Sequence, residues 1–517
     1  MRLHHKECLL LLEEMQSFCT ERQTTGISLP DIQEFIDIDP RLSLAIQDAY
    51  QFFLAIKQEF PHLYSVSEKN LIEQLQDGYC NFYGLDAIKP YVPLAAEGPW
   101  IVTSAGAVVF NVGGYGMLGL GAGARVFQEA LNKKQVMANM MTASFSQYRL
   151  MQRLRSEIGQ NRVMCPYSKF ISLNSGSEVV TLALTLTDVN SKIQTDPGAK
   201  HQGKKIMFMS LEGSFHGRTG RAARLSDSTA KYYDCLASFR DERRLITVPV
   251  NDCVALQKIF KKVDDENIFI DSFFMEPVMG EGNPGKAIEP KFYQLARKLT
   301  KEHDTFLVID SIQAGFRASG YMSLVDYPGF EQLDSPDMET FAKSINGGEF
   351  PVSLLAMTER AAALYQQGIY GNTMTGNPRG LDVISGMLDQ MTPQLRKNIC
   401  DRGLELKKNF ELLQKKYPDQ ILKVQGTGLL LSMALDAEKC PMMGAEGFEL
   451  RIRKNGINVI HGGKNALRFT PCYDLTSKQI ELLCRCLDEV FSKNTHLELS
   501  KEKNQTNIYL LPTKKAA

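Results

Sequence analysis

The stretch TFLVIDSIQAGFRASG, residues 305–320, decides the fold class of this chain. Its apolar run, Phe306 to Ile309, is typical of a strand buried on both faces, as in a parallel sheet. The run ends on a carboxylate, Asp310. Because desolvation disfavours the charged form of a buried carboxylate, we expect a cation to face Asp310 in the folded protein.

Five further strand-like runs lie between residues 169 and 357, and helical stretches separate several of them. They are KFISL (169–173), KIMFMS (205–210), RLITVPV (244–250), IFIDSFFME (268–276) and PVSLLAM (351–357). Strands that alternate with helices predict an α/β domain on a mostly parallel sheet. Ligands of such sheets bind at the carboxyl ends of the strands, so functional residues should follow the apolar runs.

The remaining chain predicts additional parts around this domain. Residues 1–90 carry apolar residues three and four apart and predict a helical N-terminal extension. We expect residues 91–165 to begin the small domain and enter the large one, which spans 166–395. Residues 396–493 predict a smaller α+β C-terminal domain, and 494–517 a polar, mobile tail.

The composition excludes several classes of function. Lys+Arg and Asp+Glu balance at 59 each, so we expect neither nucleic acid nor a membrane surface as a partner. The uncharged segment Gly98–Ala124 is too rich in glycine for a spanning helix. Its GYGMLG (114–119) lacks the acidic residue that a dinucleotide site requires downstream, and predicts a glycine-rich bend instead. Eleven scattered cysteines predict reduced thiols in the cytoplasm, with no metal site.

Two motifs after predicted strands are suited to an anion and to a flat ring. In NSGS, Ser175, Gly176 and Ser177 open a helix, whose N–H groups suit a phosphate. Ser175 would equally make a plain helix cap. In SFHGRTG, Phe215 and His216 stand in a turn of small residues where a ring could stack, although a core histidine explains the pattern as well.

Two further motifs supply charge. FFMEPVMGEG places Glu276 and Glu281 in a bent loop, which could hold a cation, steer an arginine, or be a solvated turn. Lys343, in ETFAKSINGG, has apolar and small neighbours. Desolvation would lower its pKa and make it a nucleophile toward aldehydes, although a lysine at the end of an element shows the same pattern. A phosphate cup, a stacking aromatic, a buried aspartate and a desolvated lysine together are the parts that hold pyridoxal 5′-phosphate.

With these motifs in this order, the chain from roughly Pro93 to Lys493 resembles the class III, ornithine/acetylornithine-type aminotransferases, which are fold-type I pyridoxal-phosphate enzymes. The resemblance implies that Lys343 forms the Schiff base and that Asp310 pairs with the pyridine nitrogen. It implies that Ile312 packs on the ring and Gln313 bonds the 3′-oxygen. It implies that the other cofactor contacts are Ser175, Gly176, Ser177, Phe215, His216 and Glu276.

The resemblance also implies substrate contacts and a homodimer. In NALRFTP, Arg468 would grip a substrate carboxylate, and Glu281 would neutralise this arginine when an ω-amine donor is bound. Thr373, in TMTGNP, would reach the cofactor of the neighbouring subunit. The implied reaction is a ping-pong transfer from an ω-amino acid (ornithine, lysine or an acylated form) to 2-oxoglutarate. An aminomutase or decarboxylase on the same fold and an inactive dimeric scaffold protein are the alternatives.

Three positions depart from the family pattern. Ser311 stands where a glutamate usually follows the aspartate. Gly121–Ala124 replaces a histidine-containing motif, and Glu349 lies in the glycine turn after Lys343. None of these changes removes a group that the cofactor requires, so we expect them to affect substrate choice and local hydrogen bonding.

Overall fold

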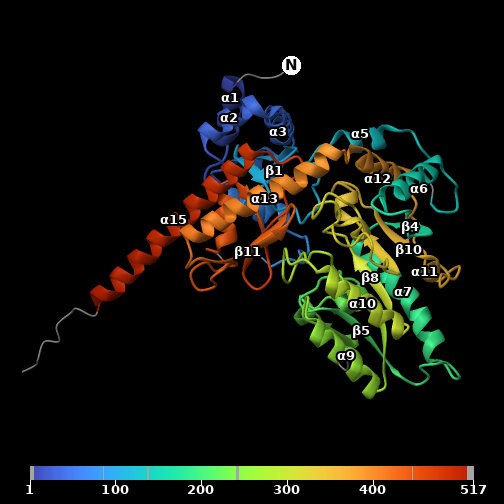
Figure 1. Ribbon diagram of the computed structural model, residues 1–517. Coiled ribbons are helices and arrows are strands. Elements are labelled where there is room, and N and C mark those ends of the chain that lie inside the picture. Colours follow the sequence, from blue (N-terminus) through green and yellow to red (C-terminus); the bar gives the residue numbers. More distant parts are fainter. Residues whose placement is uncertain (1–4, 85–86, 137–138, 240–243, 445, 509–517) are drawn as a thin grey trace, which may run out of the picture.

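The computed structural model describes residues 5–84, 87–136, 139–239, 244–444 and 446–508 (Figure 1). Its large domain is built on a seven-stranded sheet in the order β4-β10-β9-β8-β7-β5-β6. The strands are β4 (Lys169–Leu173), β5 (Lys205–Leu211), β6 (Leu245–Val248), β7 (Ile268–Met275), β8 (Phe306–Asp310), β9 (Met338–Phe341) and β10 (Ser353–Met357). Only β10 pairs antiparallel with its neighbours, so the prediction of a mostly parallel sheet is confirmed.

The sequence missed β9, although it recognised the other six strands of this sheet. β9 reads METF, and its Glu339 and Thr340 break the apolar pattern although both side chains are buried. The strand pairs parallel with β8, where Asp310 aligns with Thr340. The two strand ends that carry Asp310 and Lys343 are therefore neighbours.

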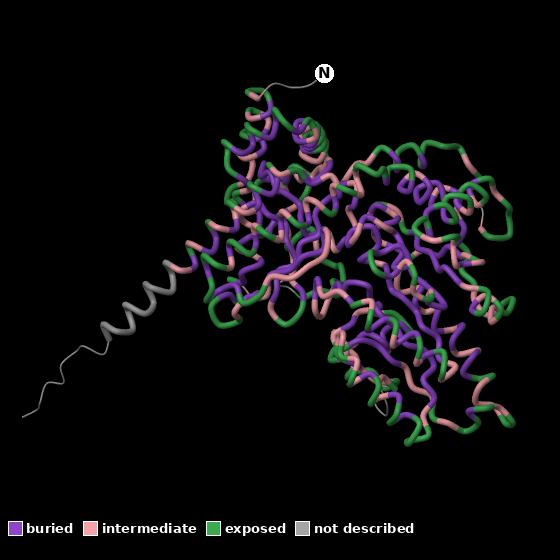
Figure 2. Tube along the Cα trace, viewed as in Figure 1, coloured by how far each residue is buried: buried purple, intermediate pink, exposed green. Residues whose placement is uncertain are grey.

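Helices cover both faces of the large sheet. Phe306 and Val308 of β8 pack with α7 (Gly176–Thr195), whereas Leu307 and Ile309 pack with α9 (Cys253–Asp265) and α10 (Pro290–Glu302). This alternation confirms that β8 is buried on both sides, and Figure 2 shows the interior of the sheet as buried. The remaining helices of this part are α5 (Arg125–Asn132), α6 (Phe145–Glu157), α8 (Ala222–Leu225), α11 (Glu359–Ala362) and α12 (Pro378–Gln390).

Segments from both ends of the chain form the smaller part. One four-stranded sheet combines β1 (Pro93–Glu97), β2 (Trp100–Thr103) and β3 (Val108–Asn111) with β13 (Ile457–Asn458). A second has the order β11-β12-β15-β14, and its strands are β11 (Ile421–Thr427), β12 (Leu430–Leu435), β14 (Ile460–Gly462) and β15 (Ala466–Phe469). The helices are α13 (Pro393–Lys416), α14 (Phe448–Lys454) and α15 (Ser477–Ile508). α15 continues to Ile508, beyond residue 493, where the C-terminal domain was predicted to end.

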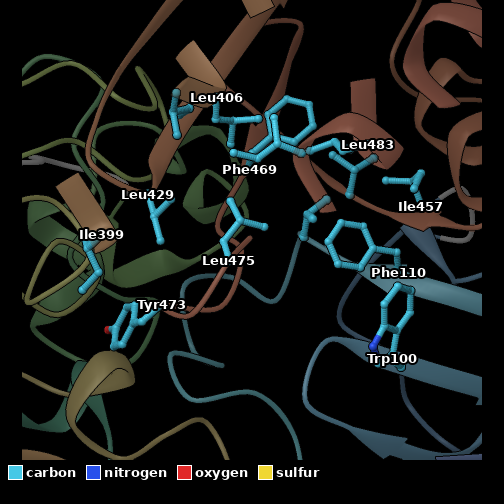
Figure 3. Close-up of a cluster of buried hydrophobic side chains, with 14 of the residues drawn as sticks. Trp100, Phe110, Ile399, Leu406, Leu429, Ile457, Phe469, Tyr473, Leu475 and Leu483 are labelled. Carbon is cyan, nitrogen blue, oxygen red and sulfur yellow. The ribbon is translucent and has the colours of Figure 1, made fainter. Parts of the chain in front are cut away.

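The N-terminal extension is helical as predicted and packs on the small domain. It contains α1 (His5–Ser17), α2 (Leu29–Ile38), α3 (Pro40–Glu59) and α4 (Glu68–Gln76). α4 ends at Gln76, and Gly78 just after it adopts a φ of +79°, a conformation that ends helices readily. Trp100 is buried against Phe35 and Phe110, and its indole N–H donates to Asp39 at 2.9 Å (Figure 3).

Ion pairs join this extension to the C-terminal part. Arg41 bonds Asp39 beside it in the chain and reaches Asp474 at 2.5 Å. Arg485 of α15 pairs with Asp31 of α2. The extension therefore belongs to the fold and is not an appended arm. In the part of the chain that the structure describes, no helix is long and apolar enough to cross a membrane.

Candidate active site

Asp310 lies buried at the carboxyl end of β8. Its Oδ2 lies 2.8 Å from Nδ1 of His216, and its Oδ1 accepts hydrogen bonds from the Ile312 N–H at 3.1 Å and the Thr340 hydroxyl at 3.2 Å. The sequence predicted a cation from outside the chain, and the structure adds a side-chain partner, because the turn after β5 brings the His216 ring to this strand end. A carboxylate held by these contacts keeps one orientation.

Lys343 follows β9 on a short 3-10 turn, η6 (Lys343–Ile345). No carboxylate lies within ion-pair distance of its Nζ among the described residues. Burial, together with the positive charge of the nearby Arg468, lowers the pKa of Lys343 to about 8. The amine therefore reaches its neutral, nucleophilic form much closer to neutral pH than an exposed lysine does.

The NSGS motif forms the start of α7 at the edge of the same pocket. The Ser175 hydroxyl caps the helix by accepting from the Glu178 N–H at 3.3 Å, so the capping role that the sequence allowed is present. Ser177 accepts from the Arg218 N–H at 3.3 Å. A Cβ on Gly176 would lie 3.0 Å from Cδ1 of Ile312, so a side chain here would press on the residue predicted to pack against the cofactor ring. Ser175, Gly176 and Ser177 line the cavity, so this helix start faces the space where an anion would bind.

Glu276 holds two loops of the pocket together. It accepts hydrogen bonds from the Gly280 N–H at 2.9 Å and the Phe215 N–H at 3.2 Å. Burial raises its pKa to about 7. Its contacts with the chain make it a support for Phe215. Nearby, Gln313 donates to the Tyr115 carbonyl at 2.8 Å, which leaves its second N–H available.

Glu281 and Arg468 form the ion pair that the sequence predicted. Nη1 of Arg468 lies 2.9 Å from Oε2 of Glu281 and also donates to the Gly280 carbonyl. Arg468 is buried on β15, whereas the Glu281 side chain is 25% exposed. A partly exposed carboxylate can leave the guanidinium more easily than a buried one, because less of its hydration was lost.

Arg218 is a residue that sequence reasoning overlooked, although it stands inside the SFHGRTG motif. Its guanidinium lies 5.6 Å from the Tyr83 ring, 5.9 Å from Phe215 and 5.6 Å from Tyr232. None of the carboxylates described in the structure pairs with it. Such an arginine, placed beside the pocket, is a ready partner for a carboxylate that is not part of the chain.

Thr373 lies away from this pocket, on an exposed loop between Gly371 and Gly376. The neighbouring Asn372 donates to Glu178 at 2.7 Å, which ties the loop to the start of α7. Thr373 therefore does not complete the pocket of its own subunit.

These strand ends and loops enclose a cavity of about 290 Å³, close to the lower limit for ligand pockets. The predicted residues that line it together are Ser175, Gly176, Ser177, Phe215, His216, Glu276, Glu281, Asp310, Ile312, Gln313, Lys343 and Arg468. An open helix start, an oriented carboxylate and a lysine with a lowered pKa fit pyridoxal phosphate. The described residues contain no cluster of acidic, histidine or cysteine side chains suited to a metal ion.

Comparison with known families gives the class of the protein. The aminotransferase class-III family matches residues 89–491, so the chain belongs to this family. It is a pyridoxal-phosphate-dependent transaminase with the fold-type I architecture, and the resemblance seen in the sequence motifs is confirmed.

Particular relatives are similar at modest identity. The acetylornithine aminotransferase of Prochlorococcus marinus subsp. pastoris is 26% identical over 333 residues, which cover 64% of this chain and 75% of that protein. The acetylornithine aminotransferase of Caldanaerobacter subterraneus subsp. tengcongensis is 27% identical over 330 residues, which cover 63% and 76%. The crystal structure of ornithine aminotransferase from Toxoplasma gondii ME49 has a TM-score of 0.71 at 18% identity, covering 86% of this chain and 99% of that one.

Proposed function

We propose that the protein transfers the terminal amino group of an ω-amino acid, namely ornithine, lysine or an acylated form, to 2-oxoglutarate by a ping-pong mechanism. The relatives named acetylornithine aminotransferase support a donor of this kind. The observation that carries the proposal is the different state of the two arginines beside the pocket, since Arg468 is paired with Glu281 and Arg218 has no carboxylate partner among the described residues.

The two arginines sort donor from acceptor. While Glu281 neutralises Arg468, we assign the α-carboxylate of an ω-amino acid to Arg218, which has no carboxylate partner among the described residues, and this turns the far amine toward Lys343. A dicarboxylate such as 2-oxoglutarate has a second carboxylate, which would displace Glu281 from Arg468. Because a guanidinium can bond a carboxylate bidentately, Arg218 is suited to the α-carboxylate of the donor and Arg468 to the second carboxylate of 2-oxoglutarate.

The chemistry requires a mobile proton next to the cofactor. Bound pyridoxal phosphate supplies an aldehyde for the amine and a ring that withdraws electrons from the substrate carbon. Nζ of Lys343 would take the proton from the substrate carbon that bears the amino group and would deliver it to C4′ of the cofactor. Asp310 would hold the ring nitrogen protonated, Ser175 to Ser177 would hold the phosphate, and Phe215 and Ile312 would enclose the ring.

A donor screen with a matched variant tests the substrate assignment. Purified holoenzyme is mixed with ornithine, lysine, N-acetylornithine, α-alanine or glutamate, and loss of the cofactor's visible band is followed without an acceptor. We expect the ω-amino acids to react, and Glu281→Gln to retard them while glutamate reacts as before or faster. Reaction with α-alanine alone, or release of CO₂ from any donor, would contradict the proposal.

We also propose a homodimer in which Thr373 reaches the cofactor phosphate of the neighbouring subunit. The exposed apolar side chains near the Thr373 loop support this arrangement: Val136, Met141, Phe145, Tyr148 and Met374. A Cβ on Gly376 would lie 2.9 Å from Cγ of Met140, so this loop adjoins that surface. Clustered exposed apolar residues mark association surfaces.

Subunit mixing tests the shared site. Lys343→Ala and Thr373→Val are each expected to be nearly inactive as pure proteins. In a mixed dimer, one pocket combines an intact Lys343 with the intact Thr373 of its partner, so activity should return toward that of one site per dimer. If mixing restores no activity while mixed dimers are present by native mass spectrometry, Thr373 does not act across the interface.

We place the enzyme in the cytoplasm. The scattered and odd-numbered cysteines of the sequence support a reducing compartment. Fractionation of cells that express the tagged full chain tests this assignment, and recovery from a membrane or exported fraction would contradict it.

A further inference from the structure

Glu339 is a buried carboxylate that the proposed chemistry does not use. It lies on β9, four residues before Lys343, with no exposed surface. Its Oε1 accepts from the Ser311 hydroxyl at 2.5 Å and the Leu324 N–H at 2.9 Å. Its Oε2 accepts from the Tyr167 hydroxyl at 2.7 Å and from the Ser323 hydroxyl. A carboxylate with four donors is fully satisfied without any cation.

One of these donors belongs to the residue next to Asp310. Ser311 follows the aspartate directly, and its N–H donates to the Thr340 carbonyl at 3.0 Å. The Thr340 hydroxyl in turn bonds Asp310. β9 therefore holds the end of β8 through two contacts to Ser311, one from the Glu339 side chain and one from the Thr340 backbone carbonyl.

Ser311 is also the position where a glutamate usually follows the aspartate in related sequences. The carboxylate that is missing from position 311 is thus present on the adjacent strand, in hydrogen-bond contact with the serine that replaced it. We propose that Glu339 is a positioning residue for Asp310, and that it substitutes from β9 for the carboxylate that relatives carry at position 311. This inference does not depend on which amino donor the enzyme uses.

Two single variants on the same carboxylate separate positioning from plain stability. Ser311→Ala and Ser323→Ala each remove one hydroxyl donor from Glu339, but only Ser311 adjoins Asp310. Each apoprotein is titrated with pyridoxal phosphate, the visible spectrum of the bound cofactor is recorded, and the melting temperature of the apoprotein is measured.

We expect Ser311→Ala to weaken cofactor affinity by about tenfold and to shift the visible band, because one charge-assisted hydrogen bond is lost. Ser323→Ala should lower the melting temperature similarly and change affinity less than twofold. Equal effects of the two variants on affinity, or no effect of either, would overturn the assignment.

An exchange of the two residues tests whether the carboxylate has moved between strands. Glu339→Ser alone takes the carboxylate away from all four donors and should lose most cofactor binding. The double variant S311E/E339S returns a carboxylate from β8 to the three donors that remain, Tyr167, Ser323 and Leu324, and should recover at least tenfold in affinity over Glu339→Ser. A folded double variant that binds the cofactor no better than Glu339→Ser would refute the exchange. If either protein fails to fold, the comparison of Ser311→Ala with Ser323→Ala still decides the positioning role.

Discussion

The pocket has two parts that are built differently. We call Asp310, Glu276 and Lys343 its floor, and Arg218 and Glu281 its rim. On the floor, every oxygen of Asp310 and Glu276 already accepts a hydrogen bond from the chain, and these groups lie at strand ends or in the loops that follow directly. On the rim, Arg218 has rings around it but no carboxylate among the described residues, and Glu281 is partly exposed. The floor is organised before any ligand arrives, whereas the rim offers charges that a ligand completes.

This contrast separates the residues that serve the reaction common to the family from the residues that select the substrate of one member. A preorganised floor suits any substrate of the family, because its residues are predicted to contact the cofactor and not the donor. Rim groups that exchange partners decide which carboxylates fit, since discrimination depends on the interactions that differ between substrates. Variants of the floor should therefore reduce turnover for all donors, and variants of the rim should change the preference among donors.

The largest effect is expected for Asp310→Asn on the floor. The amide cannot hold the ring nitrogen protonated, so kcat should fall roughly 100-fold or more for every donor. Asp271→Asn is a matched control, because Asp271 is another buried carboxylate of the large sheet, bonded to the Ser191 hydroxyl at 2.7 Å. Steady-state kinetics at measured cofactor occupancy check this. Equal losses in the two variants would show that fold damage, and not the charge, is responsible.

A smaller and selective effect is expected for Arg218→Ala on the rim. KM for ω-amino acids should rise by about 10- to 100-fold, because a charge-assisted pair with the substrate carboxylate is lost, and an amine without a carboxylate should be affected much less. Arg221→Ala is the control, since Arg221 follows in the same loop and pairs with Asp188 at 2.8 Å. A uniform loss for both kinds of amine would remove the distinction between floor and rim.

The pH dependence of cofactor uptake gives an effect of about tenfold. Only the neutral amine of Lys343 attacks the aldehyde, and its pKa is lowered to about 8. Below pH 8 the rate should fall about tenfold per pH unit, and above it the rate should level off. Stopped-flow absorbance of the apoprotein mixed with pyridoxal phosphate measures this. A rate that keeps rising up to pH 10, as expected for an exposed lysine, would show that the pKa of Lys343 is not lowered by burial.

The smallest effect is expected for Tyr83→Phe. The Tyr83 ring stacks on Tyr115 at 6.1 Å and faces Arg218, so the phenyl ring keeps most of the contact and KM should change only about two- to fivefold. Tyr83→Ala should approach the effect of Arg218→Ala on KM. Tyr79→Ala is the control, because Tyr79 lies in the same segment and is 86% exposed. Identical kinetics of Tyr83→Ala and the parent would exclude the extension from the rim.

The sequence predicted the floor better than the rim, for a physical reason. Asp310 ends an apolar run that the local pattern recognises as a strand, whereas Lys343, which follows the unrecognised strand β9, was found from its apolar and small neighbours and from the family motif. The partner of Asp310, His216, comes from a turn 94 residues away, and no local pattern announces such a contact. Tyr83 reaches the rim from the irregular segment that follows α4, which ends at Gln76, whereas the sequence predicted only that residues 1–90 are helical.

The same reason explains the missed strand and the unrecognised Glu339. Apolar alternation identifies strands whose buried side chains are apolar, but β9 buries a carboxylate that four donors satisfy from other segments. Polar residues that are buried through distant partners look exposed in a sequence. The departures from simple pattern therefore gather around the site, where buried polar groups are needed.

The only tryptophan of the chain, Trp100, lies far from this chemistry in the fold, at the junction of the N-terminal helices and the first small sheet. Its fluorescence therefore reports one event, the packing of the N-terminal extension against the small domain. A red shift of the emission will show that the N-terminal extension has dissociated from the small domain, while the visible absorbance of the cofactor shows whether the pocket is occupied. Tryptophan emission and cofactor absorbance, measured on the same untagged protein, can thus show whether the N-terminal extension must be packed before the enzyme binds its cofactor.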